Sequence, residues 1–263
     1  MKPVALSKAR LRHFVKLHQK KYRDGEGLFL AEGLRTVREL CLHLPEKDML
    51  VALLIKDGEA ESACFAEPYG GKVFVVTEKE CAQLAATSTS QGVFGVFRQQ
   101  PLERYESEEK PEQSLIIALD DVQDPGNVGT ILRTAVWFGA DAMICSSGTV
   151  DRYNPKVVRS CAGSLFTLLH YGVEQLHEEL HRLQTIGYSL VCSSLDGRDF
   201  RELAPRPNKI VLVIGNEANG ISEAITAQAD FLVRIPHCGE KAGVESLNAS
   251  VSAAILLERL TLG

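Results

Sequence analysis

Three short segments in the second half of the chain combine residues that could hold and orient a ligand. They are residues 124–129, which lead to Arg133, residues 214–220, and Ile235-Pro236 with the later residues 245–248. Their small residues let the backbone approach a ligand closely, while Asn, Glu, Ser and Arg side chains donate or accept hydrogen bonds. The three segments therefore predict a binding site that is built from loops.

The elements around these segments explain how the loops could meet. Each segment follows a short apolar run, at 115–119, 210–214 and 231–235, and precedes a helical pattern. In α/β proteins the loops at the carboxyl ends of the strands meet at one edge of the sheet. Strands alternating with helices predict an α/β fold, with a mostly parallel sheet and helices on both faces. Further strands are expected at 142–146 and 188–193, and helices at 128–138, 155–166, 174–186, 222–229 and 247–260.

The first hundred residues form a separate pattern. It predicts helices over 4–21 and 31–44 and strands over 50–55 and 73–76. The chain then turns polar from Arg98 to Gln113, with two prolines and five glutamates, which is typical of a linker. We therefore expect a first domain over 1–100, a linker over 101–113 and a second domain over 114–263.

The net charge of −5 hides a basic segment at the start of the chain. Residues 1–23 contain eight Lys or Arg and no acidic residue. Lys8, Arg12, Lys16 and Lys20 recur at every fourth position, which places them on one face of a helix. Such a face is expected for phosphate contacts with RNA, and it is equally expected for a solvated surface helix.

Cysteine usage and hydropathy indicate the compartment. The seven cysteines are odd in number, scattered and without a C-x-x-C pair, which favours a reducing environment. No apolar run is long enough to span a membrane, and no signal-peptide core follows the first charges. We expect a cytoplasmic protein with no membrane segment.

The sequence lacks two common nucleotide-binding motifs and contains one pattern typical of a metal site. Neither G-x-G-x-x-G nor G-x-x-x-x-G-K-[ST] occurs, so a standard dinucleotide fold or a P-loop is not supported. Residues 177–181 read HEELH, the zinc-protease pattern, but the apolar stripe of Leu176, Leu180 and Leu183 turns both histidines towards solvent. A zinc metalloprotease stays a remote alternative, and we expect no metal.

Asn127 and Arg133 admit structural as well as chemical roles. On a helix that begins near Asn127, its side chain could cap free backbone N–H groups. Arg133 lies among apolar residues of the sequence, and a buried guanidinium requires an anionic partner. That partner could be a substrate phosphate or an internal carboxylate.

The order of these motifs resembles the SpoU (TrmH-like) family of RNA ribose 2′-O-methyltransferases, within the SPOUT superfamily, over about residues 115–260. Residues 29–39 and 90–97 resemble the small L30e-like α/β domain that precedes many SpoU enzymes and holds RNA. The resemblance implies a trefoil knot at the C-terminal end of the second domain, S-adenosylmethionine as cofactor, and a homodimer formed through the last helix. It also implies ribosomal or transfer RNA as the partner, and the start of the chain favours ribosomal RNA.

The resemblance also assigns residues to roles. It places cofactor contacts at Ser194, Leu195, Gly215, Asn216, Ile235, Pro236 and Leu247. It places the chemistry at Asn127, Arg133, Glu217, Ser246 and Asn248, and RNA contacts at Arg35 with the basic face of Lys8, Arg12, Lys16 and Lys20. We expect Arg133 to grip a substrate phosphate, Glu217 to contact the reacting hydroxyl, and Ser246 and Asn248 to fix the ribose and the cofactor.

The alternative to an enzyme is a catalytically inactive SpoU-like protein that binds RNA during ribosome assembly. Such a protein is expected to lack Asn127, Arg133 or Glu217, and all three are present. One departure from the family pattern lies between Gly239 and Glu245, where residues 240–242 are about three extra residues in a loop that faces the cofactor.

Overall fold

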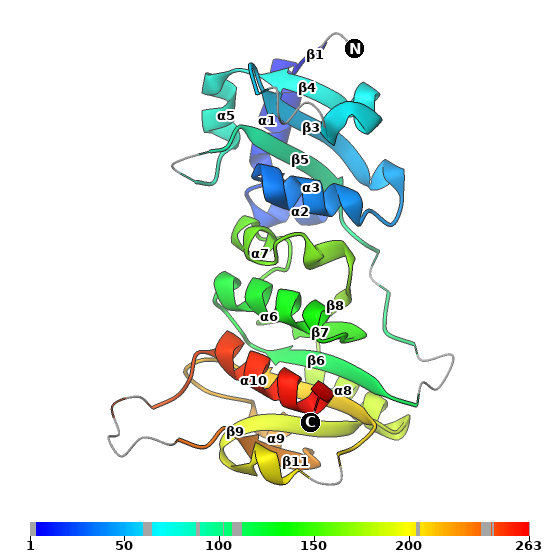
Figure 1. The fold of residues 1–263 in the computed structure, drawn as a ribbon, viewed down its shortest axis with the longest axis vertical. Coiled ribbons are helices and arrows are strands. Elements are labelled where there is room, and N and C mark those ends of the chain that lie inside the picture. Colours follow the sequence, from blue (N-terminus) through cyan, green and yellow to red (C-terminus); the bar gives the residue numbers. More distant parts are fainter. Residues whose placement is uncertain are drawn as a thin grey trace. The chain divides into compact units, whose positions relative to one another are not determined.

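The computed structural model describes residues 4–59, 65–87, 90–101, 103–106, 112–203, 206–237, 243 and 245–262. The chain divides into two compact units (Figure 1). The first comprises Met1–Pro101 and Asp151–Thr167, and the second comprises Leu102–Val150 and Leu168–Gly263. The inserted residues 240–242 and Cys238 lie outside the described residues.

The first unit is built on a five-stranded mixed sheet. Its strands are β1 Val4–Ala5, β4 Val73–Val76, β3 Leu50–Lys56, β5 Val93–Arg98 and β2 Leu28–Glu32, in that spatial order. The pairs β1–β4 and β4–β3 are parallel, and β5 runs antiparallel to both of its neighbours. Apolar side chains of α1 Lys8–Lys16 and α5 Glu78–Leu84 pack on one face of this sheet in a single core. The first hundred residues also form α2 Lys20–Glu26 and α3 Leu34–Leu42.

Two of the predicted helices in this unit are wrong in their bounds. The helix expected over 4–21 is two helices, because the chain turns after Lys16 and Leu17 inserts fully into the core. Lys20 therefore belongs to a different helix from Lys8. The helix expected over 31–44 begins only at Leu34, because Gly33 adopts a φ of 99° between β2 and α3. Only a residue without a Cβ takes that conformation readily.

Residues 151–167 belong to the core of the first unit. The predicted helix over 155–166 is broken into α7 Pro155–Ser160 and a 3₁₀ turn at Ser164–Phe166, because Ala162 and Gly163 both have positive φ. The Phe166 ring packs against the rings of Phe29 and Phe97, with centroids 5.9 Å from each.

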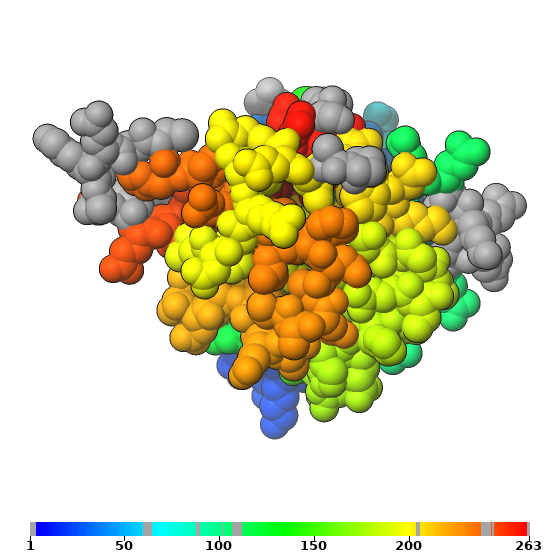
Figure 2. All heavy atoms as spheres, turned by 90° about the horizontal axis from the view of Figure 1, so that it is seen from below, coloured from blue at the N-terminus to red at the C-terminus, as the bar shows by residue number. Residues whose placement is uncertain are grey.

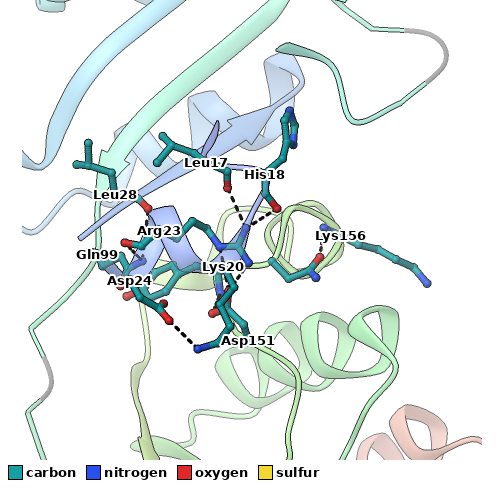
Figure 3. A network of polar contacts seen from close by, with 11 residues as sticks. Leu17, His18, Lys20, Arg23, Asp24, Leu28, Gln99, Asp151 and Lys156 are labelled. Carbon is teal, nitrogen blue, oxygen red and sulfur yellow. Dashed lines mark hydrogen bonds and ion pairs between the residues drawn. The ribbon is translucent and has the colours of Figure 1, made fainter. Parts of the chain in front are cut away.

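Arg23 joins this segment to the start of the chain (Figure 3). Arg23 is only 2% exposed, and its guanidinium donates two hydrogen bonds to the Asp151 carboxylate, at 2.6 and 2.9 Å. It also donates to the backbone carbonyls of Leu17 and His18, both at 2.8 Å. All of the charge on this buried arginine is thus matched inside the unit. One of the eight basic residues near the start of the chain is therefore structural.

The second unit contains a six-stranded sheet in which every pairing is parallel, as the alternation of strands and helices predicted. Its strands run in the order β11-β9-β10-β6-β7-β8. They are β11 Phe231–Arg234, β9 Ser189–Asp199, β10 Lys209–Gly215, β6 Ser114–Asp120, β7 Ala142–Ser146 and β8 Leu169–Val173. The sequence did not predict β8, which carries the buried His170.

Helices cover both faces of this sheet. Successive strand residues point to opposite faces, so Ile116 and Val211 pack with α8 Leu176–Thr185 and α9 Glu223–Thr226. On the other side lie α6 Pro125–Trp137 and α10 Ala249–Leu262 (Figure 1). These two helices pack against each other, and α10 also packs against β10. No helix in the described ranges is long and apolar enough to cross a membrane. The trefoil knot stays a prediction.

Candidate active site

Two neighbouring strands bring the predicted loops together. β6 and β10 pair in register, with Leu119 opposite Ile214 and Asp120 opposite Gly215. The loops that follow these strands therefore start side by side at the carboxyl edge of the sheet. Asp120, only 8% exposed, accepts the Ser222 N–H through Oδ2 at 2.7 Å, which ties the end of the second loop to the first strand.

A tight turn over residues 216–220 projects Glu217. The backbone groups of Asn216 and Gly220 exchange two hydrogen bonds of 2.9 Å, and Gly220 has a φ of 70°. The Asn216 Oδ1 accepts the N–H groups of Ala218 and Asn219 at 2.8 and 3.0 Å. A side chain at Gly215 would meet the backbone of Gly220, so the turn closes only because that position has no Cβ.

Asn127 lies in the first turn of α6 and does not cap it. The helix begins at Pro125, and the cap is Asp124, whose Oδ1 accepts the Asn127 N–H at 3.0 Å. The prediction that Asn127 occupies the cap position is wrong, because Pro125 needs no N–H partner and starts the helix two residues earlier. The Asn127 side chain is 7% exposed and makes its hydrogen bonds with other side chains.

Three of the predicted catalytic side chains form one hydrogen-bonded chain. The Asn127 Nδ2 donates to Glu217 Oε1 at 2.6 Å, and the Asn248 Nδ2 donates to Asn127 Oδ1 at 2.9 Å. The Asn248 Oδ1 in turn accepts the backbone N–H of Ser250 at 3.0 Å, at the start of α10. A backbone N–H can only donate, so it fixes the orientation of both amides, and every bond of the chain donates towards Glu217.

Glu217 is therefore the accepting end of this chain. A carboxylate offers two oxygens, and Oε1 is held by Asn127 while the residue is exposed to the site. Its second oxygen can accept a hydroxyl hydrogen from a substrate. The arrangement suits the orientation of an alcohol for attack on an electrophile.

Arg133 is not part of this chain. Residues six apart on a helix point about 120° away from each other, so Arg133 and Asn127 face different directions on α6. Arg133 is exposed, and the described residues give it no hydrogen bond or ion pair. The expectation of a buried guanidinium is therefore wrong, because Ile131, Leu132 and Ala135 occupy the buried faces of the helix and Arg133 does not.

A cleft of about 490 Å³ lies beside Glu217 and contains most of the predicted cofactor residues. Ser194, Leu195, Gly215, Asn216, Ile235 and Leu247 line it, together with Glu217 and Ser246, whereas Pro236 is not among the described lining residues. Figure 2 shows that the segments of β9 (yellow) and β11 (orange) lie side by side at this end of the second unit.

The character of the cleft fits S-adenosylmethionine. Its volume lies in the range of small-molecule sites, and aliphatic residues from three separate segments can sandwich an adenine ring: Leu195 of β9, Ile235 after β11 and Leu247 before α10. Leu195 and Leu247 are 67% and 47% exposed, so both side chains are available to a ligand in the cleft. The residues present therefore fit the group.

The sequence did not single out several residues of the site. Asp120 and Asp121 contact the 216–222 loop, and Asp196, Thr226, Arg234 and Ser252 line the cleft. Two consecutive acidic residues directly after a buried strand were a usable signal, because charged residues at the carboxyl end of a strand face the site in this fold class. The others carry no local signal.

The HEELH segment is part of a structural helix. His177 and His181 are exposed on α8, and no group of three potential metal ligands occurs among the described residues. The buried charged residue of the motif is Glu179, which accepts hydrogen bonds from Tyr171 at 2.8 Å and Arg182 at 2.7 Å. Nothing in the described part of the chain supports the zinc-protease alternative.

Comparison with known proteins agrees with this geometry. Residues 114–258 match the SpoU rRNA Methylase family, and residues 8–95 match an MRM3-like substrate binding domain. The 23S rRNA (guanosine(2553)-2′-O)-methyltransferase RlmP of Bacillus subtilis is 32% identical over 254 residues, which are 95% of each chain.

Two solved structures share the whole fold. An AdoMet-bound rRNA methyltransferase from Sinorhizobium meliloti has a TM-score of 0.80 and 30% identity, over 98% of this chain and 95% of that one. The SpoU methyltransferase AviRb from Streptomyces viridochromogenes, in complex with AdoMet, has a TM-score of 0.83 and 25% identity, over 97% and 98%. The chain thus belongs to the SpoU rRNA methylase family and is an S-adenosylmethionine-dependent RNA ribose 2′-O-methyltransferase.

Proposed function

We propose that this chain methylates the 2′-hydroxyl of a guanosine ribose in large-subunit ribosomal RNA. The observation that carries the proposal is the chain of hydrogen bonds from Asn248 through Asn127 to Glu217, beside a cleft that fits the cofactor. The choice of RNA rests on the likeness to the Bacillus subtilis enzyme over nearly the whole of both chains.

In the proposed reaction, Glu217 accepts the hydrogen of the ribose hydroxyl and turns the oxygen lone pair towards the cleft. When bound, S-adenosylmethionine supplies an already activated methyl group, so the protein mainly has to orient the nucleophile and take its proton. Asn127 holds the carboxylate in place, and Asn248 holds Asn127. Ser246 lines the same cleft and fixes the ribose or the cofactor.

Arg133 has a separate role in this proposal. Its exposed guanidinium is available to an RNA phosphate next to the target ribose, for which a planar fork of donors is well suited. A phosphate held there would place the ribose relative to α6. A guanidinium offers N–H donors and no acceptor, so Arg133 serves as an anchor in this proposal.

The first unit supplies the proposed RNA surface. Lys8, Arg12, Lys16, Lys20 and Arg35 are all exposed, and residues 8–95 match a substrate-binding domain. Lys20 pairs with Asp24 at 2.7 Å, so it offers less charge to RNA than the others. We propose that residues 1–100 bind RNA, that 101–113 link the domains, and that 114–263 carry out methyl transfer.

The homodimer also remains a proposal. Two helices that pack against each other, α6 and α10, expose the apolar residues Trp137 and Val251, at 84% and 46%. Each of the two helices therefore presents an exposed apolar side chain that a partner could cover. A cytoplasmic location is proposed together with ribosomal RNA as substrate.

Ribose-methylation mapping of total RNA from cells with and without the gene tests the function. We expect one guanosine of the large-subunit RNA to lose its 2′-O-methyl group, and to regain it when the gene is returned. Return of Glu217→Gln should not restore the mark. A complete methylation pattern without the gene would contradict the proposal and favour the inactive assembly factor.

A further inference from the structure

Asp121 has an unusual backbone conformation at the carboxyl end of β6. Its φ is 58°, and Ala162 is the only other described non-glycine residue with positive φ. Residues with a Cβ avoid this region unless the surrounding structure holds them there, and such positions cluster at functional sites. Asp121 follows β6, which pairs with β10, and the loop that carries Glu217 follows β10.

Contacts from two loops hold Asp121. Its N–H donates to Ser146 Oγ at 2.9 Å, from the end of β7, and its carboxylate accepts Gln123 Nε2 at 3.3 Å. The carboxylate also lies directly against Gly148, where an added Cβ would overlap it. These contacts fix both the peptide and the side chain of Asp121 in the strained conformation.

The strained peptide directs the Asp121 carbonyl to Asn216. The Asn216 Nδ2 donates to that carbonyl at 2.8 Å, and its Oδ1 accepts two N–H groups of the 216–220 turn. The two N–H donors fix the orientation of the amide, so the bond to Asp121 is specific. Asp120 meanwhile holds Ser222. Two consecutive aspartates therefore fasten both ends of the loop that carries Glu217.

We propose that Asp121 is a positioning residue for methyl transfer, which acts through Asn216 to hold the Glu217 carboxylate against Asn127. The inference rests on the proposed role of Glu217. Asp121 itself contacts neither substrate nor cofactor in this account. Its contribution is the direction of one carbonyl, which a residue that avoids positive φ cannot provide.

The main test compares two substitutions at this position. Asp121→Val should lower kcat by about a hundredfold, the scale for a misplacement of about 1 Å near the reacting atoms, with KM for RNA little changed. Asp121→Gly should recover most of that loss, because glycine adopts positive φ readily. A purely structural role of the carboxylate predicts that valine and glycine are equally harmful.

A second variant leaves the strained backbone intact. Asn216→Asp keeps the acceptor for the turn but removes the donor to the Asp121 carbonyl, and it should lower kcat in the same way. Ala162→Val is the matched control, since it places a β-branched residue at the other described positive φ, in the first unit. We expect it to lower the melting temperature and leave kcat near the native value.

A double-mutant cycle with Glu217→Gln separates the two proposals. If Asp121 acts through Glu217, Asp121→Val adds little to the loss caused by Glu217→Gln. Full additivity, or a native kcat for both Asp121→Val and Asn216→Asp, would overturn the positioning role while leaving Glu217 in place. A native kcat for Glu217→Gln alone would instead overturn the role of Glu217 on which the inference rests.

Discussion

The Asn127 Nδ2 lies 2.6 Å from Glu217 Oε1, although the two residues are ninety positions apart in the sequence. This short bond is the last of a series that begins at the backbone of α10 and passes through Asn248. Helix α10, helix α6 and the loop after β10 are therefore coupled through three side chains. A displacement of any one of these elements should therefore change the position of the Glu217 carboxylate.

Asn127→Ala should reduce methyl transfer by about a hundredfold, because the Glu217 carboxylate loses the donor that orients it. Asn127→Asp places an acceptor where a donor is needed and should be as harmful. Single-turnover rates with saturating RNA and cofactor measure the effect. The pair Asn127→Ala and Asn248→Ala should be non-additive, since both act on one chain of bonds. Independent effects of the two changes would contradict the coupling.

Arg133→Ala should reduce methyl transfer by about a hundredfold or more and leave cofactor affinity near the native value. Because Arg133 is exposed, the free energy of unfolding should change by no more than about 0.5 kcal/mol. Arg133→Lys should recover the rate only in part, because a point charge does not reproduce a two-pronged grip on phosphate. Melting temperature, cofactor affinity and turnover, measured on the same variants, distinguish a role in catalysis from a role in stability. A stable variant that methylates at the native rate would remove Arg133 from the mechanism.

Trp137→Glu and Val251→Glu should shift the protein towards monomers if α6 and α10 form the dimer surface. A charge in the middle of an apolar interface lacks a partner and loses its hydration. Leu42→Glu serves as the control, because Leu42 is 68% exposed in the first unit and lies outside that surface. Light scattering at micromolar concentration gives the mass. A native protein that is already monomeric there would end the dimer proposal.

Arg23→Ala should lower the free energy of unfolding by about 3–5 kcal/mol, because it leaves the Asp151 carboxylate without its buried partner. Lys20→Ala is the matched control. It removes an exposed ion pair with Asp24, which has a similar length of 2.7 Å and is worth about 0.3–0.5 kcal/mol. Urea unfolding of the intact chain measures both. Similar losses for the two variants would show that burial of the Arg23 pair is unimportant.

The acid stability of the second unit should depend on Glu179. Burial raises the pKa of Glu179, but hydrogen bonds from Arg182 and Tyr171 outweigh it and lower the pKa overall. A group with a lowered folded-state pKa contributes stability above its unfolded pKa of about 4.3, and that stability is lost as the pH falls through the folded value. Glu179→Gln should therefore be destabilising at pH 7, with a smaller penalty at pH 3. Urea titrations at both pH values test this, and a penalty that does not shrink in acid would contradict it.

Buried strands were the most predictable part of the fold. The run at 142–146 became β7 with the same bounds, because a continuous apolar segment between turn residues has few alternatives. β8 was missed because His170 and Gly172 interrupt its apolar pattern. The break after α7 depends on positive φ at Ala162 and Gly163, and only the glycine is a residue type that indicates this conformation.

The sequence named residues that the structure brings together, but it did not predict their geometry. The family resemblance pointed to Asn127, Glu217 and Asn248, and no local pattern could show that their amides share one direction of donation. The exposure of Arg133 was available from periodicity, because it shares a helix face with Thr130 and Trp137, both exposed. The apolar residues next to Arg133 in the sequence suggested burial, but adjacent residues of a helix lie on different faces, so their burial does not extend to Arg133.

The participation of residues 151–167 in the first unit sets an order of events during synthesis. Residues 1–101 leave the ribosome without Asp151 and Phe166, so Arg23 has no counter-charge and the rings of Phe29 and Phe97 lack a packing partner. The first unit can mature only after β6, α6 and β7 of the second have also been translated. Domains generally fold in the order of translation, but here residues 1–101 cannot complete their unit until residues 151–167 have been translated. A pause in translation between residues 101 and 151 would leave an incomplete first unit with an apolar face exposed.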